Sequence, residues 1–355
     1  MKRYGHLFEQ VCSMENLRLA HKNARKGKTW YAEIKEVSEH EEEYLTALRN
    51  MLLNKTYDTS EYIVFMRREG RKDRQIFKLP YYPDRICQWA LIQIIEPYLL
   101  KQLMSCTYSA IPGRGIHQAV KHIHGAIKKD PKGMRYCLKL DVSKYYPSID
   151  HTVLKQKLRR LFKDPDLLWL LDEIIDSTPG NVGIPIGNYF SQYAGNFYLS
   201  SFDHWIKEVK RVKHYFRYMD DICIFADNKE DLHAIFLEVR DYLEQELHLT
   251  IKANWQVFPT FVRGLDFVGY RFFQDYTLLR KSTCQQFKRK MLNIARKIRQ
   301  HIEMTFSEWC AINSYKGWLI WCDGHRLAQK YIAPIQPYAE QFYIQHVKGK
   351  AGIVT

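Results

Sequence analysis

Two adjacent carboxylates between apolar segments constrain this chain more than any other feature of its sequence. They are Asp220 and Asp221, within 218–221 (Tyr-Met-Asp-Asp). Aromatic residues precede them and the apolar run 222–225 (Ile-Cys-Ile-Phe) follows, so we predict a β-hairpin with the acids at its tip. Carboxylates beside a buried core repel each other and lose hydration unless cations neutralise them, and Mg²⁺ and Mn²⁺ prefer such oxygen ligands. The alternative is a solvated turn, because aspartate is common in turns.

A third carboxylate, Asp141, follows the β-type run 135–140 (Arg-Tyr-Cys-Leu-Lys-Leu). An aspartate at the end of one strand and an aspartate pair on a neighbouring hairpin can meet at two metal ions about 4 Å apart, the arrangement used by polymerases and nucleases. We therefore expect Asp141, Asp220 and Asp221 to be the catalytic residues and the metal ligands. Adjacent strand residues point to opposite faces, so the turn geometry decides the direction of Asp221.

Three segments in this order resemble palm motifs A, B and C of reverse transcriptases. They are 140–146 (Leu-Asp-Val-Ser-Lys-Tyr-Tyr), 183–192 (Gly-Ile-Pro-Ile-Gly-Asn-Tyr-Phe-Ser-Gln) and 218–221. Motif B has Ile-Gly at 186–187 and Ser-Gln at 191–192, where most reverse transcriptases have Gln-Gly and Ser-Pro. In this variant the chain resembles the reverse transcriptases of diversity-generating retroelements.

The resemblance continues on both sides of these motifs. Segments 74–80 and 84–88 are similar to the fingers motif shared with group II intron enzymes, and 109–117 resembles the next block. Segment 264–270 resembles the primer-grip hairpin. Ordered motifs thus cover about residues 60 to 275, a set far more specific than any single motif.

The resemblance implies an α+β right-hand polymerase fold with fingers, a ferredoxin-like palm and a helical thumb. The expected domains are an N-terminal helical extension over 1–59, fingers over 60–134, a palm with inserted fingers segments over 135–276, and a thumb over 277–355. Local patterns agree. A strand-rich segment from 62 to 80 carries a basic hairpin tip, and strands and helices alternate through the expected palm. Helices are predicted over 84–102, 152–162, 166–177, 229–247 and, amphipathically, within 1–59.

Phosphate contacts are expected at the fingers hairpin. A guanidinium group from Arg67 or Arg68, together with Arg74, is suited to grip the incoming triphosphate. Lys252 resembles the lysine of palm motif D, which donates a proton to the leaving pyrophosphate. Ordinary solvated charge is the alternative for each of these residues.

Two further positions bear on nucleotide selection. Tyr146 lies five residues past Asp141, where reverse transcriptases place an aromatic ring that blocks a ribose 2′-hydroxyl; core packing, or the same role for Tyr145, are the alternatives. Ile186 can only pack where a glutamine would form hydrogen bonds, so we predict lower fidelity. Gly187 allows close backbone approach to the substrate.

The tail is predicted to form a basic helix. Apolar residues recur at helical spacing, and every charged residue from 280 to 299 is positive, so one face is expected to pack and the other to attract phosphate. A solvated basic helix without a partner is the alternative. The candidate nucleic-acid-binding residues are Arg280, Lys281, Lys288, Arg289, Arg296 and Lys297.

The resemblance implies an RNA-directed DNA polymerase that uses two Mg²⁺ ions, or Mn²⁺, and deoxynucleoside triphosphates. Its product is error-prone, adenine-mutagenised cDNA copied from a template-repeat RNA, which makes an RNA/cDNA duplex a further partner. A small basic accessory variability protein is the implied protein partner. The alternatives are a group II intron-like, retron or phage-defence reverse transcriptase and, from another class, a non-catalytic RNA-binding protein on a polymerase scaffold.

Composition is consistent with a polyanionic partner. Lys and Arg number 54 against 39 Asp and Glu, for a net charge of +15, which suits nucleic acid or an anionic membrane. No run of about eighteen apolar residues and no signal core occur, so we expect a soluble, cytoplasmic protein without a membrane partner. The resemblance implies a bacterial, phage or archaeal host cell. The eight cysteines form no CxxC pair, which favours buried free thiols over disulfides or zinc.

Overall fold

The computed structural model describes residues 3–69 and 72–348. Helices and sheets are mixed in it, as the sequence predicts for the α+β class. None of the helices in the described ranges is both long and apolar enough to cross a membrane. The chain divides into two compact units. The first comprises Met1–Gly113, Lys139–Cys223 and His233–Trp255, and the second Arg114–Leu138, Ile224–Leu232 and Gln256–Thr355.

The first unit begins with the predicted amphipathic helices, whose apolar residues Leu17, Leu45 and Leu48 are fully buried. These helices are α1 (Phe8–Val11), α2 (Met14–Ala24), α3 (Ala32–Glu39) and α4 (Glu41–Leu53). They are followed by the other helical elements of this unit, which include the predicted helices with small shifts at their ends. These are η1 (Tyr81–Arg85), α5 (Ile86–Leu100), η2 (Tyr146–Ser148), α7 (His151–Leu161), α8 (Pro165–Asp176), α9 (Tyr189–Tyr198), α10 (Ser200–His204) and η3 (Trp205–Val209).

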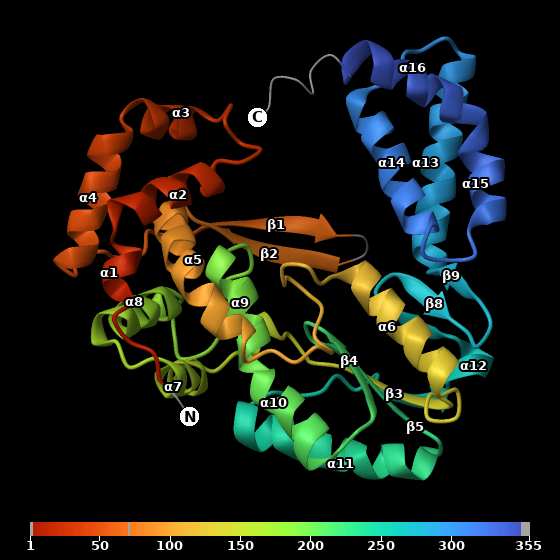
Figure 1. The fold of residues 1–355 in the computed structure, drawn as a ribbon, viewed down its shortest axis with the longest axis horizontal. Coiled ribbons are helices and arrows are strands. Elements are labelled where there is room, and N and C mark those ends of the chain that lie inside the picture. The colour runs from red at the N-terminus through yellow and green to blue at the C-terminus, as the bar shows by residue number, and fades with distance from the viewer. Residues whose placement is uncertain (1–2, 70–71, 349–355) are drawn as a thin grey trace. The chain divides into compact units, whose positions relative to one another are not determined.

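The predicted fingers hairpin is present as an antiparallel pair, β1 (Ile63–Glu69) and β2 (Lys72–Lys78), drawn in orange in Figure 1. Arg67 lies opposite Arg74, and Arg68 lies opposite Asp73. Directly opposed residues share a face of a hairpin, so Arg67 and Arg74 lie on one face and Arg68 on the other. The predicted basic tip, at Gly70 and Arg71, lies outside the described residues.

A four-stranded sheet of order β4-β5-β3-β6 carries the acidic motifs. Its strands are β3 (Tyr136–Asp141), β4 (His214–Tyr218), β5 (Asp221–Ala226) and β6 (Gln256–Pro259). Strands β4 and β5 are joined by the two-residue turn Met219–Asp220, so the predicted hairpin is confirmed. Helix α11 (Lys229–Leu247) has the predicted bounds.

The second unit combines a small sheet with a helical bundle. The sheet has the order β7-β8-β9, and helices α13 to α16 lie side by side in blue in Figure 1. Phe287, Met291 and Ile294 form the buried face of α13. The elements of this unit are α6 (Ile116–Lys129), α12 (Thr260–Arg263), β7 (Leu265–Phe267), β8 (Tyr270–Phe272), β9 (Thr277–Leu279), α13 (Lys281–Arg299), α14 (Phe306–Leu319), α15 (His325–Tyr331), η4 (Ala333–Ile335) and α16 (Gln336–His346).

Half-buried tryptophans of the bundle stack on other aromatic residues of this unit. Trp318 stacks on Tyr270 with ring centres 5.3 Å apart, and Trp309 stacks on Tyr343 at 6.0 Å. All eight cysteines are free, and four of them are buried: Cys12, Cys87, Cys137 and Cys223.

Asp164 joins the start of the chain to α8. Its carboxylate caps this helix by accepting from the backbone N–H of Leu167, and it also accepts from the N–H groups of Leu7 and Phe8 at 2.7 and 3.0 Å. Burial alone would raise the pKa of Asp164, but these backbone donors outweigh it and hold the pKa below its ordinary value.

We predict that Asp164→Ala lowers the free energy of unfolding by about 2 kcal/mol, because it removes a cap and leaves buried N–H groups without an acceptor. Urea unfolding at pH 7 measures the loss. The difference from wild type should shrink as the pH falls below about 4, since a group with a depressed folded-state pKa stabilises only while ionised.

Asp166→Ala is the matched control. This carboxylate lies in the same helical turn, but it forms a half-exposed ion pair with Lys55 at 2.5 Å. Exposed pairs contribute about 0–1 kcal/mol. Equal losses for the two variants would contradict the role given to Asp164.

Candidate active site

The β4–β5 turn places one carboxylate at its tip. Met219 has a φ of 56°, in the left-handed region that side-chain-bearing residues seldom occupy. This conformation reverses the chain within two residues, so that Asp220 lies in the turn itself and Asp221 begins β5. The two predicted ligands therefore have different surroundings although they are adjacent in sequence.

Asp220 and Asp141 lie together, from the turn and from the end of β3. Burial and the nearby Asp141 carboxylate, through a hydrogen bond and its charge, raise the pKa of Asp220 to about 7. Nζ of Lys252 lies 2.7 Å from Oδ2 of Asp141, and the Lys252 N–H donates to the Asp141 carbonyl at 2.9 Å. One lysine thus faces a pair of acids, and the site holds an excess of negative charge.

Asp221 is paired differently. Its carboxylate lies 3.3 Å from Nζ of Lys139. Lys139 and Asp141 are two residues apart on β3 and share a face of the strand, so Asp221 reaches that same face. Within the described ranges, however, no three His, Cys, Asp or Glu residues form a metal-binding group. The structure therefore brings Asp141 and Asp220 together and leaves the third predicted ligand beside a lysine.

The carboxylate oxygens of Asp141 and Asp220 are suited to bind a divalent cation. Oδ1 of Asp141 is buried, and while both acids are ionised no residue that the structure describes donates a hydrogen bond to it. Two carboxylates in contact repel each other unless a proton or a cation lies between them. Carboxylate oxygens are the ligands that Mg²⁺ and Mn²⁺ prefer.

A cavity of about 460 Å³ opens beside Asp220. Its walls come from the fingers hairpin, from the segment after β3 and from the loop before α9. Of the residues predicted to bind nucleotide, the walls include Arg74, Tyr146, Ile186 and Lys252. Both faces of the hairpin contribute to the walls, Arg74 on the face of Arg67 and Asp73 on the face of Arg68, so both arginines remain candidates.

The adjacent residues Tyr145 and Tyr146 have different contacts. Tyr145 is buried, and its hydroxyl donates to the carbonyl of Gly195 on α9. Tyr146 is half-buried, and its hydroxyl lies 3.6 Å from Sδ of Met219. A Cβ at Gly195 would lie 3.3 Å from the Tyr146 ring and 3.5 Å from the Met219 sulfur, so this glycine makes room for both. Because Tyr145 is committed to α9, Tyr146 is the better candidate for contact with a sugar.

The loop that carries Ile186 and Gly187 is bound to its neighbours through the main chain. The Phe77 N–H donates to the Ile186 carbonyl at 2.9 Å, and the Ile184 N–H donates to the Tyr146 carbonyl at 3.0 Å. Gly187 has a φ of 120°, and a Cβ there would lie 2.9 Å from the carbonyl oxygen of Phe77. This glycine therefore permits a close approach to the backbone of β2. From the sequence we expected a close approach to the substrate.

Three of the six cations predicted on the tail are engaged by an acid or an aromatic ring of their own unit, and Arg289 and Arg296 donate to Gln285 and Asn293 of α13 itself. Arg280 pairs with Asp266 at 2.6 Å, and Lys297 pairs with the buried Glu308 at 2.8 Å. The ammonium group of Lys288 lies 5.9 Å from the centre of a tyrosine ring. Lys281, Arg289 and Arg296 are exposed.

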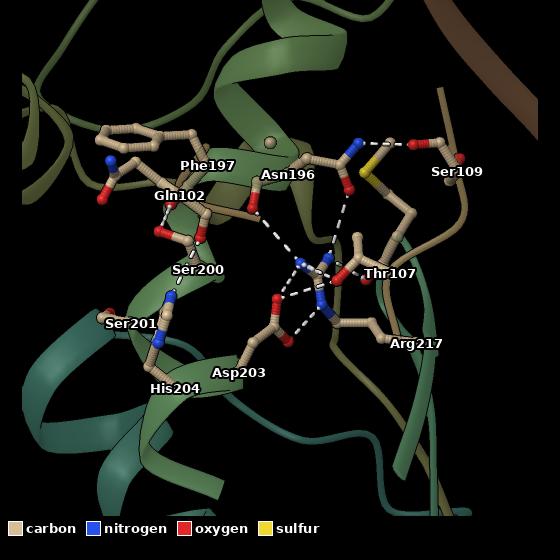
Figure 2. A network of polar contacts seen from close by, with 12 residues as sticks. Gln102, Thr107, Ser109, Asn196, Phe197, Ser200, Ser201, Asp203, His204 and Arg217 are labelled. Atoms are coloured by element: carbon tan, nitrogen blue, oxygen red, sulfur yellow. Dashed lines mark hydrogen bonds and ion pairs between the residues drawn. The ribbon is translucent and has the colours of Figure 1, made fainter. Parts of the chain in front are cut away.

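Two residues beside the acids were missed by sequence reasoning. Lys139 gave no signal of its own among many lysines. Arg217 is fully buried one residue before the motif C tyrosine (Figure 2), and a charged side chain inside an apolar strand was the available signal.

A family model and two known proteins match this chain. Residues 67–272 match the family model described as reverse transcriptase (RNA-dependent DNA polymerase). Protein YkfC of Escherichia coli (strain K12) is 24% identical in an alignment of 235 residues, and the match covers 54% of this chain and 61% of that protein. The apo telomerase structure from Candida tropicalis matches with a TM-score of 0.48 and 12% identity, covering 66% of this chain and 50% of that one.

This chain therefore spans less than two thirds of the length of either relative. The family match covers more than half of its 355 residues and includes Asp141, Asp220 and Asp221. The chain belongs to the reverse transcriptase (RNA-dependent DNA polymerase) family.

Proposed function

We propose that this chain is an active RNA-directed DNA polymerase that extends a primer 3′-hydroxyl with deoxynucleotides. The observation that carries the proposal is a cavity that presents Asp220, Arg74 and Lys252 together, with Nζ of Lys252 also 2.7 Å from Oδ2 of Asp141. Phosphoryl transfer asks a protein mainly for positioning and charge stabilisation, and this site offers both.

Each side chain has a role that its position supports. Asp141 and Asp220, with Asp221 as a third candidate, would hold Mg²⁺ or Mn²⁺, which supplies charge stabilisation and activation of the primer hydroxyl. Arg74 is suited to bind triphosphate oxygens with its guanidinium fork. Lys252 balances Asp141 and can donate a proton to the leaving pyrophosphate.

We assign the chain to the diversity-generating retroelement type on its motif B residues. Ile186 lines the cavity and offers a nucleotide only apolar contact. On this assignment the template is a template-repeat RNA, the cDNA is mutated at template adenines, and a small basic accessory protein takes part. Group II intron-like, retron and phage-defence enzymes are the neighbouring alternatives.

The proposed domains are an extension over 1–59, fingers over 60–134, palm over 135–276 and thumb over 277–355.

The exposed cations of α13 support a nucleic-acid contact in the thumb. A helix turns about 100° per residue, which places Lys281, Arg289 and Arg296 within about 80° of one another around the axis. Phe287 and Ile294, which are buried, lie on the opposite side. One face of α13 therefore packs while the other presents positive charge, the pattern expected for binding a phosphate backbone.

Asp220→Asn tests the proposed metal-binding carboxylates. Loss of this carboxylate should lower deoxynucleotide incorporation on a primed RNA by about a thousandfold, because several kcal/mol of transition-state stabilisation are removed. Primer-extension rates in Mg²⁺ or Mn²⁺ measure the effect, and filter binding of the same RNA should be unchanged. Asp241→Asn, an exposed carboxylate of α11, is the matched control.

A wild-type chain that binds primed RNA but incorporates nothing with either metal would favour the non-catalytic scaffold. Incorporation by Asp220→Asn at the wild-type rate would remove the proposed site.

Ile186→Gln tests the retroelement assignment. We predict fewer misincorporations opposite template adenine, because the amide restores a polar contact near the nascent base pair. Sequencing of cDNA from one RNA template gives the error spectrum, with Ile186→Leu as the apolar control. Identical spectra for all three proteins would exclude Ile186 as a cause of infidelity while leaving the polymerase proposal intact.

Replacing Lys281, Arg289 and Arg296 together with glutamine should weaken RNA binding. The slope of log affinity against log salt should fall by about 0.7 to 0.9 for each phosphate that the helix no longer neutralises. Lys297→Gln on the same helix is the control, since Lys297 is engaged with Glu308 and its replacement should affect stability more than the slope. An unchanged slope for the triple variant would argue for a solvated helix.

A further inference from the structure

A buried ion pair lies next to the catalytic turn. The guanidinium group of Arg217 on β4 and the carboxylate of Asp203 on α10 are both fully inaccessible to solvent. Nε of Arg217 donates to Oδ1 of Asp203 at 2.7 Å and Nη2 donates to Oδ2 at 2.5 Å, so the pair is bidentate (Figure 2). Tyr215 and Thr107 also donate to Asp203 through their hydroxyl groups, at 2.6 and 3.0 Å.

The same guanidinium group reaches the turn itself. Nη1 of Arg217 donates to the carbonyl oxygen of Met219 at 3.0 Å and to Oδ1 of Asn196 at 3.3 Å. Nη2 also donates to the Asn196 carbonyl at 3.3 Å. Asn196 itself is held, because its amide donates to the Ser109 carbonyl at 2.6 Å. The fork therefore binds α9, α10 and the peptide that leads directly into Asp220.

That peptide needs support. Met219 has a φ of 56°, a strained conformation for a residue with a side chain, and such conformations persist where surrounding contacts over-determine them. The hydrogen bond from Arg217 is charge-assisted and excluded from water, which places it among the stronger kinds. On its other side, Met219 is contacted through sulfur by Tyr146.

We propose that Arg217, oriented by Asp203, is a positioning residue for Asp220. Its hydrogen bond to the Met219 carbonyl holds the turn in the left-handed conformation and so aims the Asp220 carboxylate at Asp141. Arginine suits this role because its five N–H donors lie in a fixed fork that satisfies a carboxylate and still has an arm for the turn. The proposal rests on the proposed function, since it assigns the means by which that site is held.

The double variant Arg217→Met, Asp203→Leu separates positioning from folding. It leaves no unpaired buried charge, and apolar replacement of a buried ion pair is often neutral or stabilising. RNA affinity should therefore stay close to wild type, whereas the melting temperature should fall, because the buried hydroxyl groups of Tyr215 and Thr107 lose their acceptor. Displacement of a catalytic group by about 1 Å costs about a hundredfold in rate, so kcat should fall between tenfold and a hundredfold while KM for the deoxynucleotide changes little.

Arg217→Lys is the second variant, in case the double variant does not fold. Lysine cannot bind both the carboxylate and the turn, so we expect kcat to fall at nearly constant KM. The fall should be smaller than in the double variant, because a positive charge remains beside Asp203. The control is Arg159→Met with Asp172→Leu, an exposed pair between α7 and α8, which should leave kcat unchanged.

A folded double variant with wild-type kcat would overturn the proposal, as would a loss expressed in KM alone. Failure of the proposed function gives a different result, because the wild type would then be inactive under the same conditions.

Discussion

Burial of charge around a single turn is the constraint on which this structure depends. Arg217 and Asp203 are fully buried and cancel each other, which is the condition under which two charges remain stable without solvent. Asp141 and Asp220 are not balanced in this way, because Lys252 is shared between them as a counter-charge. The neutral pair is suited to hold the backbone still, and the unbalanced pair is suited to attract cations. A few residues of β4 and its turn thus connect the buried Arg217–Asp203 pair to the Asp141–Asp220 site.

Local sequence patterns were sufficient for much of the fold. The hairpin around Met219 follows from two β-type runs with turn residues between them, and α7 and α8 lie within one residue of the helices predicted over 152–162 and 166–177. Membership of the reverse transcriptase family is consistent with the predicted right-hand polymerase fold, within which these elements have an expected order. The chain order of the three palm motifs supported the prediction of this fold more strongly than any single element.

Contacts between distant parts of the chain could not be predicted in the same way. Asp221 is 82 residues from Lys139, and no local pattern indicates that they meet. Arg280 and Lys297 look alike in a basic run, yet both are engaged by acids brought near by the fold. The number of positive charges on α13 can be counted in the sequence, whereas packing decides which of them remain available to a ligand. Burial of Arg217 on β4 is of the same kind, since it depends on Asp203 of α10 lying beside it.

The hydrogen bond between Phe77 and Ile186 has a mechanical consequence. It joins β2 to the loop before α9 through the main chain, at the point where Gly187 lets the two backbones meet without a side chain between them. A rotation of the fingers hairpin toward a bound nucleotide would therefore carry this loop with it. Closure of the hairpin over the triphosphate and contact of the loop with the nascent base pair would then occur in one movement. A substitution that weakens the Phe77–Ile186 hydrogen bond would uncouple them.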